Sequence, residues 1–219
     1  MAREDSSSAR SSLVASNSHL GDRVVVAAGC ALLAAPAGAI LAASVLPVPF
    51  GVCVAAVLPA VLAALAVLAV TTPHSGLSRK LGYGLAAGAA ATAAYDLVRV
   101  ALWLVDLVDH PFRTITLYGE AMLPGSPAAS AAGWGFHLWN GLVFAMFFVA
   151  TVHRPSILKG VAWALLLDAM QTVTLTEVPG MTVGQEFLTA SIVGHLAYGA
   201  TLGWLAAKEA HAMEGGKPQ

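Results

Sequence analysis

Apolar residues fill six stretches of the chain, and most charged residues and prolines lie in the segments between them. A membrane-spanning helix needs about 20 predominantly apolar residues, and each stretch is about that long. The pattern therefore predicts an all-α fold, a polytopic membrane bundle of six transmembrane helices. The predicted helices span residues 24–46, 48–71, 82–107, 132–152, 157–176 and 187–207.

The two ends of the chain differ in composition from the stretches between them. Residues 1–22 are rich in serine and in charges of both signs, without an apolar period, which is typical of a disordered tail. The predicted organisation is therefore this cytoplasmic tail, a transmembrane domain at 23–207 and a second cytoplasmic tail at 208–219.

Overall composition agrees with a membrane protein. Of the 219 residues, 58% are hydrophobic and 11% are charged, and the mean hydropathy is +0.75. Soluble domains average about 45–50% apolar and about 25% charged residues, so composition excludes that class. With 11 Lys and Arg against 12 Asp and Glu, the chain has no excess of positive charge with which to bind nucleic acid. The expected partner is the lipid bilayer, and a homo-oligomer stays open.

Lysine and arginine fall almost entirely on one set of connecting segments. If successive helices alternate in direction, nine of these residues lie on one side and only Arg113 lies on the other, while Arg99 lies within a span. Cytoplasmic segments carry the excess of such residues, so we expect both termini in the cytoplasm. The nine residues are Arg3, Arg10, Arg23, Arg79, Lys80, Arg154, Lys159, Lys208 and Lys217.

The long connection at 108–131 lies on the opposite, outer side. It contains three prolines together with an apolar patch of Ile115, Leu117 and Tyr118. This composition predicts an interfacial segment that caps the outer face of the bundle.

Four predicted helices each carry a pair of polar residues with i, i+3 spacing, which places both side chains on one face of a helix. An ionisable group in hydrocarbon costs about 2.5–3.5 kcal/mol on insertion scales and normally faces a partner or a water-filled cavity. All four pairs fall in or close to the outer half of the bilayer, so we expect them to line one pocket that opens outward. The pairs are Asp96 with Arg99, His137 with Asn140, Asp168 with Gln171, and His195 with Tyr198.

Two of these predicted helices contain similar short sequences. The segment His-Leu-Trp-Asn-Gly at 137–141 resembles His-Leu-Ala-Tyr-Gly at 195–199, and each follows a span with a buried aspartate. Spans three and four and spans five and six are therefore candidates for two copies of one hairpin.

Small residues recur every fourth position on two predicted helices. Gly84, Gly88 and Thr92 form one row, and Gly199 and Gly203 form another. Rows of this kind let helix backbones approach closely in lipid, so we expect close helix contacts at these positions.

The simplest interpretation of the polar pairs is packing. Asp96 and Arg99 would neutralise each other, and the two histidines would each donate one interhelical hydrogen bond. Such bonds average only about 0.6 kcal/mol between membrane helices, so two aspartates and two histidines are a costly means of holding helices together. Charged groups at this depth instead favour a functional site.

The working hypothesis is a membrane-embedded enzyme that acts on a lipophilic small molecule such as an isoprenoid, a quinone or a lipid. Asp168 is the expected general acid, and a neighbouring histidine accepts protons. A metal-assisted version places zinc or iron on His137, His195 and Asp168. The candidate catalytic residues are Asp96, Asp168, His137 and His195, and the candidate supporting residues are Arg99, Asn140, Gln171 and Tyr198.

Two alternatives stay open. In a proton- or cation-coupled transporter, the aspartates and histidines would form the relay, although the inner halves of the spans hold few polar residues. In a haem electron-transfer protein, His137 and His195 would be the axial ligands, although two carboxylates in the same pocket argue against haem.

Three segments resemble a family of uncharacterised bacterial multipass membrane proteins. They are Gly-His-Leu-Ala-Tyr-Gly-Ala-Thr-Leu-Gly at 194–203, His-Leu-Trp-Asn-Gly at 137–141 and Lys-Gly at 159–160. The resemblance covers predicted spans three to six. It implies a location in the bacterial cell membrane and carries no activity, cofactor or catalytic residue.

Overall fold

The computed structural model describes residues 50–71, 77–175 and 182–215, and these residues form helices and turns with no strand. The all-α prediction is therefore confirmed for the described part of the chain. The helices are α2 (Phe50–Thr71), α3 (Leu77–Leu104), α4 (Arg113–Met122), α5 (Ala129–Thr151), α6 (Ile157–Leu175) and α7 (Gln185–Gly215). The predicted tail at 1–22 and the predicted helix at 24–46 lie outside the described residues.

Five predicted stretches coincide with helices, and the largest difference is at the end of α7. The sequence predicts that this helix ends at residue 207, whereas α7 continues to Gly215. The added residues include alanine, lysine and glutamate, which favour helix, and the helix stops at a glycine, which favours a helix end. The predicted end is wrong because it was placed where the apolar residues stop, whereas the residues that follow still favour helix.

Two helical segments among the described residues are long and apolar enough to cross a membrane. They are Arg79–Leu104 in α3 and Ala129–Thr151 in α5, and a shorter apolar stretch, Gly51–Ala64, lies in α2. The six-span prediction is therefore not confirmed. In α6 and α7, buried polar residues such as Asp168 and His195 interrupt the apolar sequence.

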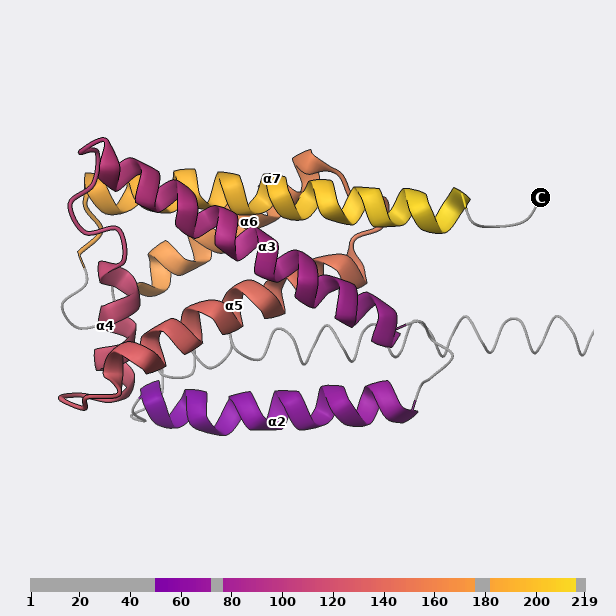
Figure 1. Cartoon of the computed structure of the whole chain (residues 1–219). Coiled ribbons are helices and arrows are strands. Elements are labelled where there is room, and N and C mark those ends of the chain that lie inside the picture. The colour runs from indigo at the N-terminus through magenta and orange to yellow at the C-terminus, as the bar shows by residue number, and fades with distance from the viewer. Residues whose placement is uncertain (1–49, 72–76, 176–181, 216–219) are drawn as a thin grey trace, which may run out of the picture.

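Successive long helices run in opposite directions, and α3, α5, α6 and α7 form a bundle with α4 across one end and α2 beside α5 (Figure 1). α3 is central because it packs against both α5 and α7, while α6 packs against α7. Ala91 of α3, Phe148 of α5 and Leu202 of α7 are fully buried in one core cluster. A second cluster joins Val61 of α2 to Val143 of α5.

The rows of small residues lie at helix contacts, as the sequence predicts. Gly88 of α3 packs so closely on α5 that an added Cβ would meet the main chain at Gly141 and Leu142. Gly199 of α7 packs in the same way on Gly160 of α6. These positions set the distance between the helices of the α3–α5 and α6–α7 pairs.

α3 ends in a left-handed turn at Asp106, whose φ is 57°. The amide of Asp106 donates to the carbonyl of Trp103 at 3.1 Å, and the amide of Leu107 donates to that of Leu102 at 2.9 Å. This paired bonding satisfies the last carbonyls of the helix. The turn leads the chain across the end of the bundle.

The 108–131 connection contains α4, which lies directly on α5. Gly119 of α4 and Gly133 of α5 allow this contact, because a Cβ on either glycine would collide with the main chain of the other element. Ile115 and Tyr118 are buried against the bundle. The expected cap is present, but these two residues of its apolar patch face the protein interior.

Replacing Gly160 by leucine should destabilise the protein, because the new side chain would enter the backbone of α7 at Gly199 and Gly203. Overpacking of this kind costs about 1–3 kcal/mol. Gly82→Leu is the matched control, since that position has open space around it. Thermal unfolding in detergent should give a lower midpoint for Gly160→Leu alone, and equal midpoints for the two variants would contradict the contact.

Candidate functional site

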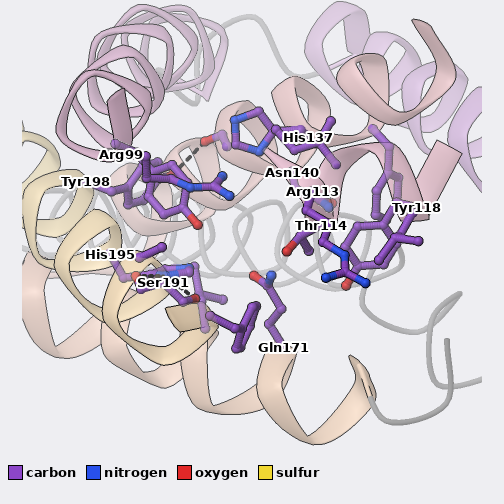
Figure 2. Close-up of a pocket in the computed structure, with 18 of the residues that line it drawn as sticks. Arg99, Arg113, Thr114, Tyr118, His137, Asn140, Gln171, Ser191, His195 and Tyr198 are labelled. Atoms are coloured by element: carbon purple, nitrogen blue, oxygen red, sulfur yellow. Dashed lines mark hydrogen bonds between the residues drawn. The ribbon is translucent and has the colours of Figure 1, made fainter. Parts of the chain in front are cut away.

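A cavity of about 250 Å³ lies among α3, α5, α6 and α7, with α4 at its end. Asp96 and Asp168 do not line it, and each contacts a histidine that does. The polar faces of the four helices therefore meet at one cavity, as their spacing predicts. Six of the eight predicted site residues line the cavity (Figure 2), namely Arg99, His137, Asn140, Gln171, His195 and Tyr198.

His137 of α5 is bonded to Asp96 of α3. The imidazole Nε2 lies 3.0 Å from Oδ1 and 3.1 Å from Oδ2 of the carboxylate. Because an ionised carboxylate only accepts hydrogen bonds, Nε2 is the nitrogen that donates. Nδ1 makes no hydrogen bond to the described residues.

His195 of α7 is bonded to Asp168 of α6 and to its own helix. Nδ1 lies 2.8 Å from the carbonyl oxygen of Ser191 and 3.2 Å from Oδ1 of Asp168. The hydroxyl of Ser191 donates to the same Oδ1. The Ser191 hydroxyl also lies 3.4 Å from Nδ1 of His195, but its own hydrogen bond is donated to the carboxylate, so we describe Ser191 as a partner of Asp168. Within the described part of the chain, Nε2 of His195 has no hydrogen-bond partner.

The two helix pairs share one arrangement. In each, an aspartate on the first helix contacts a histidine on the second. The glycine four residues after each histidine packs on the first helix, Gly141 on Thr92 and Gly199 on Gly160. The hydroxyl of Tyr198 donates to the carbonyl of Gly141 at 2.6 Å and so joins the two pairs.

Tyr95 lies against both histidines, and the sequence analysis did not identify it. Its ring centroid is 5.1 Å from that of His195 and 5.7 Å from that of His137. Tyr95 lies four residues before Arg99, and Ser191 lies four residues before His195. Residues with i, i+4 spacing share a helix face, so this spacing is the signal in the sequence that points to both. The other lining residues that the i, i+3 spacing missed include Thr92, Arg113, Thr114 and Tyr118, of which the last three belong to α4.

Arg99 does not pair with Asp96, contrary to the packing interpretation. Asp96 is turned to His137, and among the described residues no carboxylate lies within ion-pair distance of Arg99. The guanidinium carbon lies 5.2 Å from the ring centroids of Tyr95 and of Phe112, which is a cation–π geometry. The residue is only 5% exposed, and its Nε has no hydrogen-bond partner in the described ranges. Arg99 is thus a buried cation at the cavity wall.

The edge of the cavity carries one carboxylate, Glu186, in the first turn of α7. It accepts hydrogen bonds from the backbone amides of Asp109 at 2.8 Å and His110 at 3.0 Å. These bonds lower the pKa of Glu186, the one from His110 having the larger effect. The contact ties the start of α7 to the segment that leads into α4.

The residues proposed as zinc or iron ligands do not form one site. His137 faces Asp96, whereas His195 faces Asp168. The described residues contain no group of three or more His, Cys, Asp or Glu side chains placed to hold a metal ion. For haem, both imidazole rings pack on Tyr95 and would have to turn away from it to ligate one iron.

No protein-family model, curated protein or solved structure matches this chain. These comparisons therefore do not identify a protein that shares the 194–203 segment. Function is inferred from the geometry of the cavity.

We expect the contact made by Glu186 to weaken in acid. Because its folded-state pKa is lowered, the carboxylate contributes stability above the usual glutamate pKa of about 4.3 and loses that contribution as pH falls through the lowered pKa. Glu186→Gln removes the charge. The unfolding midpoint of the wild type should exceed that of this variant by a constant margin at pH 6–7, and the margin should shrink below about pH 4. A margin that does not change anywhere on the acid side of the titration would contradict the assignment.

Proposed function

We propose that the chain is a multipass protein of the bacterial cell membrane with six spans and both termini in the cytoplasm. Large apolar side chains on the outer helix faces support this location: Leu97 is 68%, Val173 74% and Leu158 78% exposed. Such surfaces mark contact with lipid or with another protein. Cationic residues at the bundle end away from α4 support the orientation, namely Arg79, Lys80, Arg154 and Lys159.

We propose further that the α3–α5 and α6–α7 pairs are two copies of one hairpin. The shared Asp–His contact and the shared close approach of the glycine after the histidine support this relationship. The bonded nitrogen is Nε2 in one copy and Nδ1 in the other, so the two histidines present different edges to the cavity.

The function that this geometry supports best is acid–base catalysis on a lipophilic small molecule within the membrane. The observation that carries it is that each cavity histidine has one nitrogen held beside a carboxylate outside the lining, at 3.0 Å for His137 and 3.2 Å for His195. The other nitrogen of each ring has no hydrogen-bond partner among the described residues. A carboxylate in this position fixes the tautomer and orientation of an imidazole and stabilises the imidazolium that forms when the ring takes a proton. Two such histidines can supply an acid and a base to one substrate.

The roles differ from those that the sequence suggests. Asp168 accepts hydrogen bonds from Ser191 and His195 and does not line the cavity, so it is a positioning residue and no longer the general acid. Asp96 has the same role behind His137. We assign proton transfer to His137 and His195.

Transport has less support than catalysis. The bundle end away from α4 is closed by an apolar core that includes Ala87, Phe148, Leu202 and Ala206, all 3% exposed or less. A proton or cation path through this region would need polar groups. The cavity is therefore proposed as a reaction chamber.

The protein in nanodiscs should convert a component of a lipid extract from its expression host. Reactions run in H₂¹⁸O and in D₂O would label products of hydrolysis and of proton transfer to carbon, respectively, for detection by mass spectrometry. His137→Asn and His195→Asn should each slow labelling by about 10²–10⁴-fold, the usual contribution of acid–base catalysis. Asp96→Asn should slow it less, because the histidine remains.

The matched controls are His153→Asn and Asp106→Asn, which change exposed residues outside the cavity lining and should leave labelling unchanged. Equal labelling by the wild type and the two cavity-histidine variants would contradict the proposal. So would the absence of any labelled product, and a proton flux in liposomes that His195→Asn abolishes would then favour transport.

A further inference from the structure

We propose that the cavity binds an amphiphile with an oxyanion head group, a phosphate or a carboxylate, and that Arg99 and Arg113 recognise this group. The inference rests on the proposed function, whose substrate class it names. It starts from Arg99, a nearly buried cation on the cavity wall whose Nε has no hydrogen-bond partner among the residues that the structure describes. Arginine is rarely buried unless it is paired, and its planar fork of donors matches a phosphate or carboxylate.

The protein does not provide that oxyanion from its own nearby carboxylates. Asp96, on the same helix, is bonded through both oxygens to His137. Asp168 is bonded to Ser191 and His195. The aromatic contacts of Arg99 hold the guanidinium in place while leaving its donor groups without an acceptor in the described residues.

A second cation lies at the same cavity. Arg113 begins α4, and both it and Thr114 line the space into which Arg99 projects (Figure 2). The start of a helix carries a partial positive charge that favours anions. The amides of Arg113 and Ile115 already donate to backbone carbonyls, so the main contribution at this position is the charge of the Arg113 side chain. The only carboxylate of the lining within the described residues is Glu186, which is already bonded to two backbone amides.

The rest of the lining indicates an apolar chain. It includes Ile115, Phe136, Phe144, Leu167 and Met170, which offer no charge to a ligand. An isoprenoid or acyl chain suits these residues, while the oxyanion binds at Arg99.

The oxyanion would lie next to the proposed reaction centre. The ring of Tyr95 contacts the guanidinium of Arg99 and both imidazoles. A head group bound by Arg99 therefore places the adjoining carbon atoms of the ligand beside His137 and His195. Binding energy from the charged head would position the reacting part of the molecule.

The test is a thermal-shift titration of the full-length protein in phosphatidylcholine nanodiscs. The probes are dodecyl phosphate and laurate, with dodecanol and inorganic phosphate as controls for the chain and for the anion alone. A saturating anionic amphiphile should raise the unfolding midpoint by about 5 °C or more, whereas the two controls should leave it unchanged. Comparing dodecyl phosphate with laurate identifies the preferred oxyanion.

Arg99→Gln should weaken binding by about 10- to 100-fold, the usual effect of losing charge-assisted hydrogen bonds. Arg113→Gln, at a more exposed position, should weaken it less. Arg79→Gln is the matched control, since Arg79 pairs with Glu209 away from the cavity, and it should bind as the wild type does. Arg99→Lys keeps the charge and covers the case in which Arg99→Gln does not fold; this variant should bind more weakly than the wild type, because lysine cannot form the bidentate contact.

Two results would overturn the inference: shifts from dodecanol equal to those from dodecyl phosphate, or full affinity in both Arg99 variants. The histidine variants separate this outcome from that of the proposed function. If His137→Asn and His195→Asn bind the probe while even the wild type shows no turnover, the oxyanion site is supported and the proposed catalysis is refuted. If the wild type turns over neutral lipids but does not bind the probe, catalysis is supported and the oxyanion site is refuted.

Discussion

Close contact between helix backbones is the constraint on which the rest of the structure depends. Aspartate has a short side chain, so its carboxylate reaches an imidazole on a neighbouring helix only when the two helices approach closely. Gly88 and Gly141 allow that approach between α3 and α5, and Gly160 and Gly199 allow it between α6 and α7. Apolar side chains gain little free energy when they move from lipid into a helix contact, so close packing is also what stabilises helix association in a membrane.

The helix contacts determine which polar groups face the cavity and which lie outside its lining. Both aspartates lie behind histidines and outside the cavity lining, while the histidines and Arg99 face the cavity. A buried polar group is costly unless it is hydrogen-bonded, and Asp96 meets this requirement through His137 and Asp168 through Ser191. Arg99 instead lies against the rings of Tyr95 and Phe112 and has no carboxylate partner in the described part of the chain, and its charge is the one that the proposed ligand would match.

The sequence predicted much of this arrangement, since the positions of the long helices and the four polar helix faces follow from spacing along single helices. It assigned the wrong partner to Asp96, because Arg99 is one turn away on the same helix whereas His137 is 41 residues distant. It also gave no sign that Ser191 donates to Asp168. The helix α4 was missed because it is short and mixes polar with apolar residues.

Sequence alone determined which residues are apolar enough for helices in a membrane-like environment and which faces of those helices carry charge, since both depend on the 3.6-residue period of one helix. Only the tertiary structure decided how those charges pair, which of them face the cavity, and that α4 brings Arg113 to the same space as Arg99. These outcomes depend on the distance and rotation between helices. Packing of small side chains sets this distance and this rotation, and neither can be predicted from the spacing of residues along one helix.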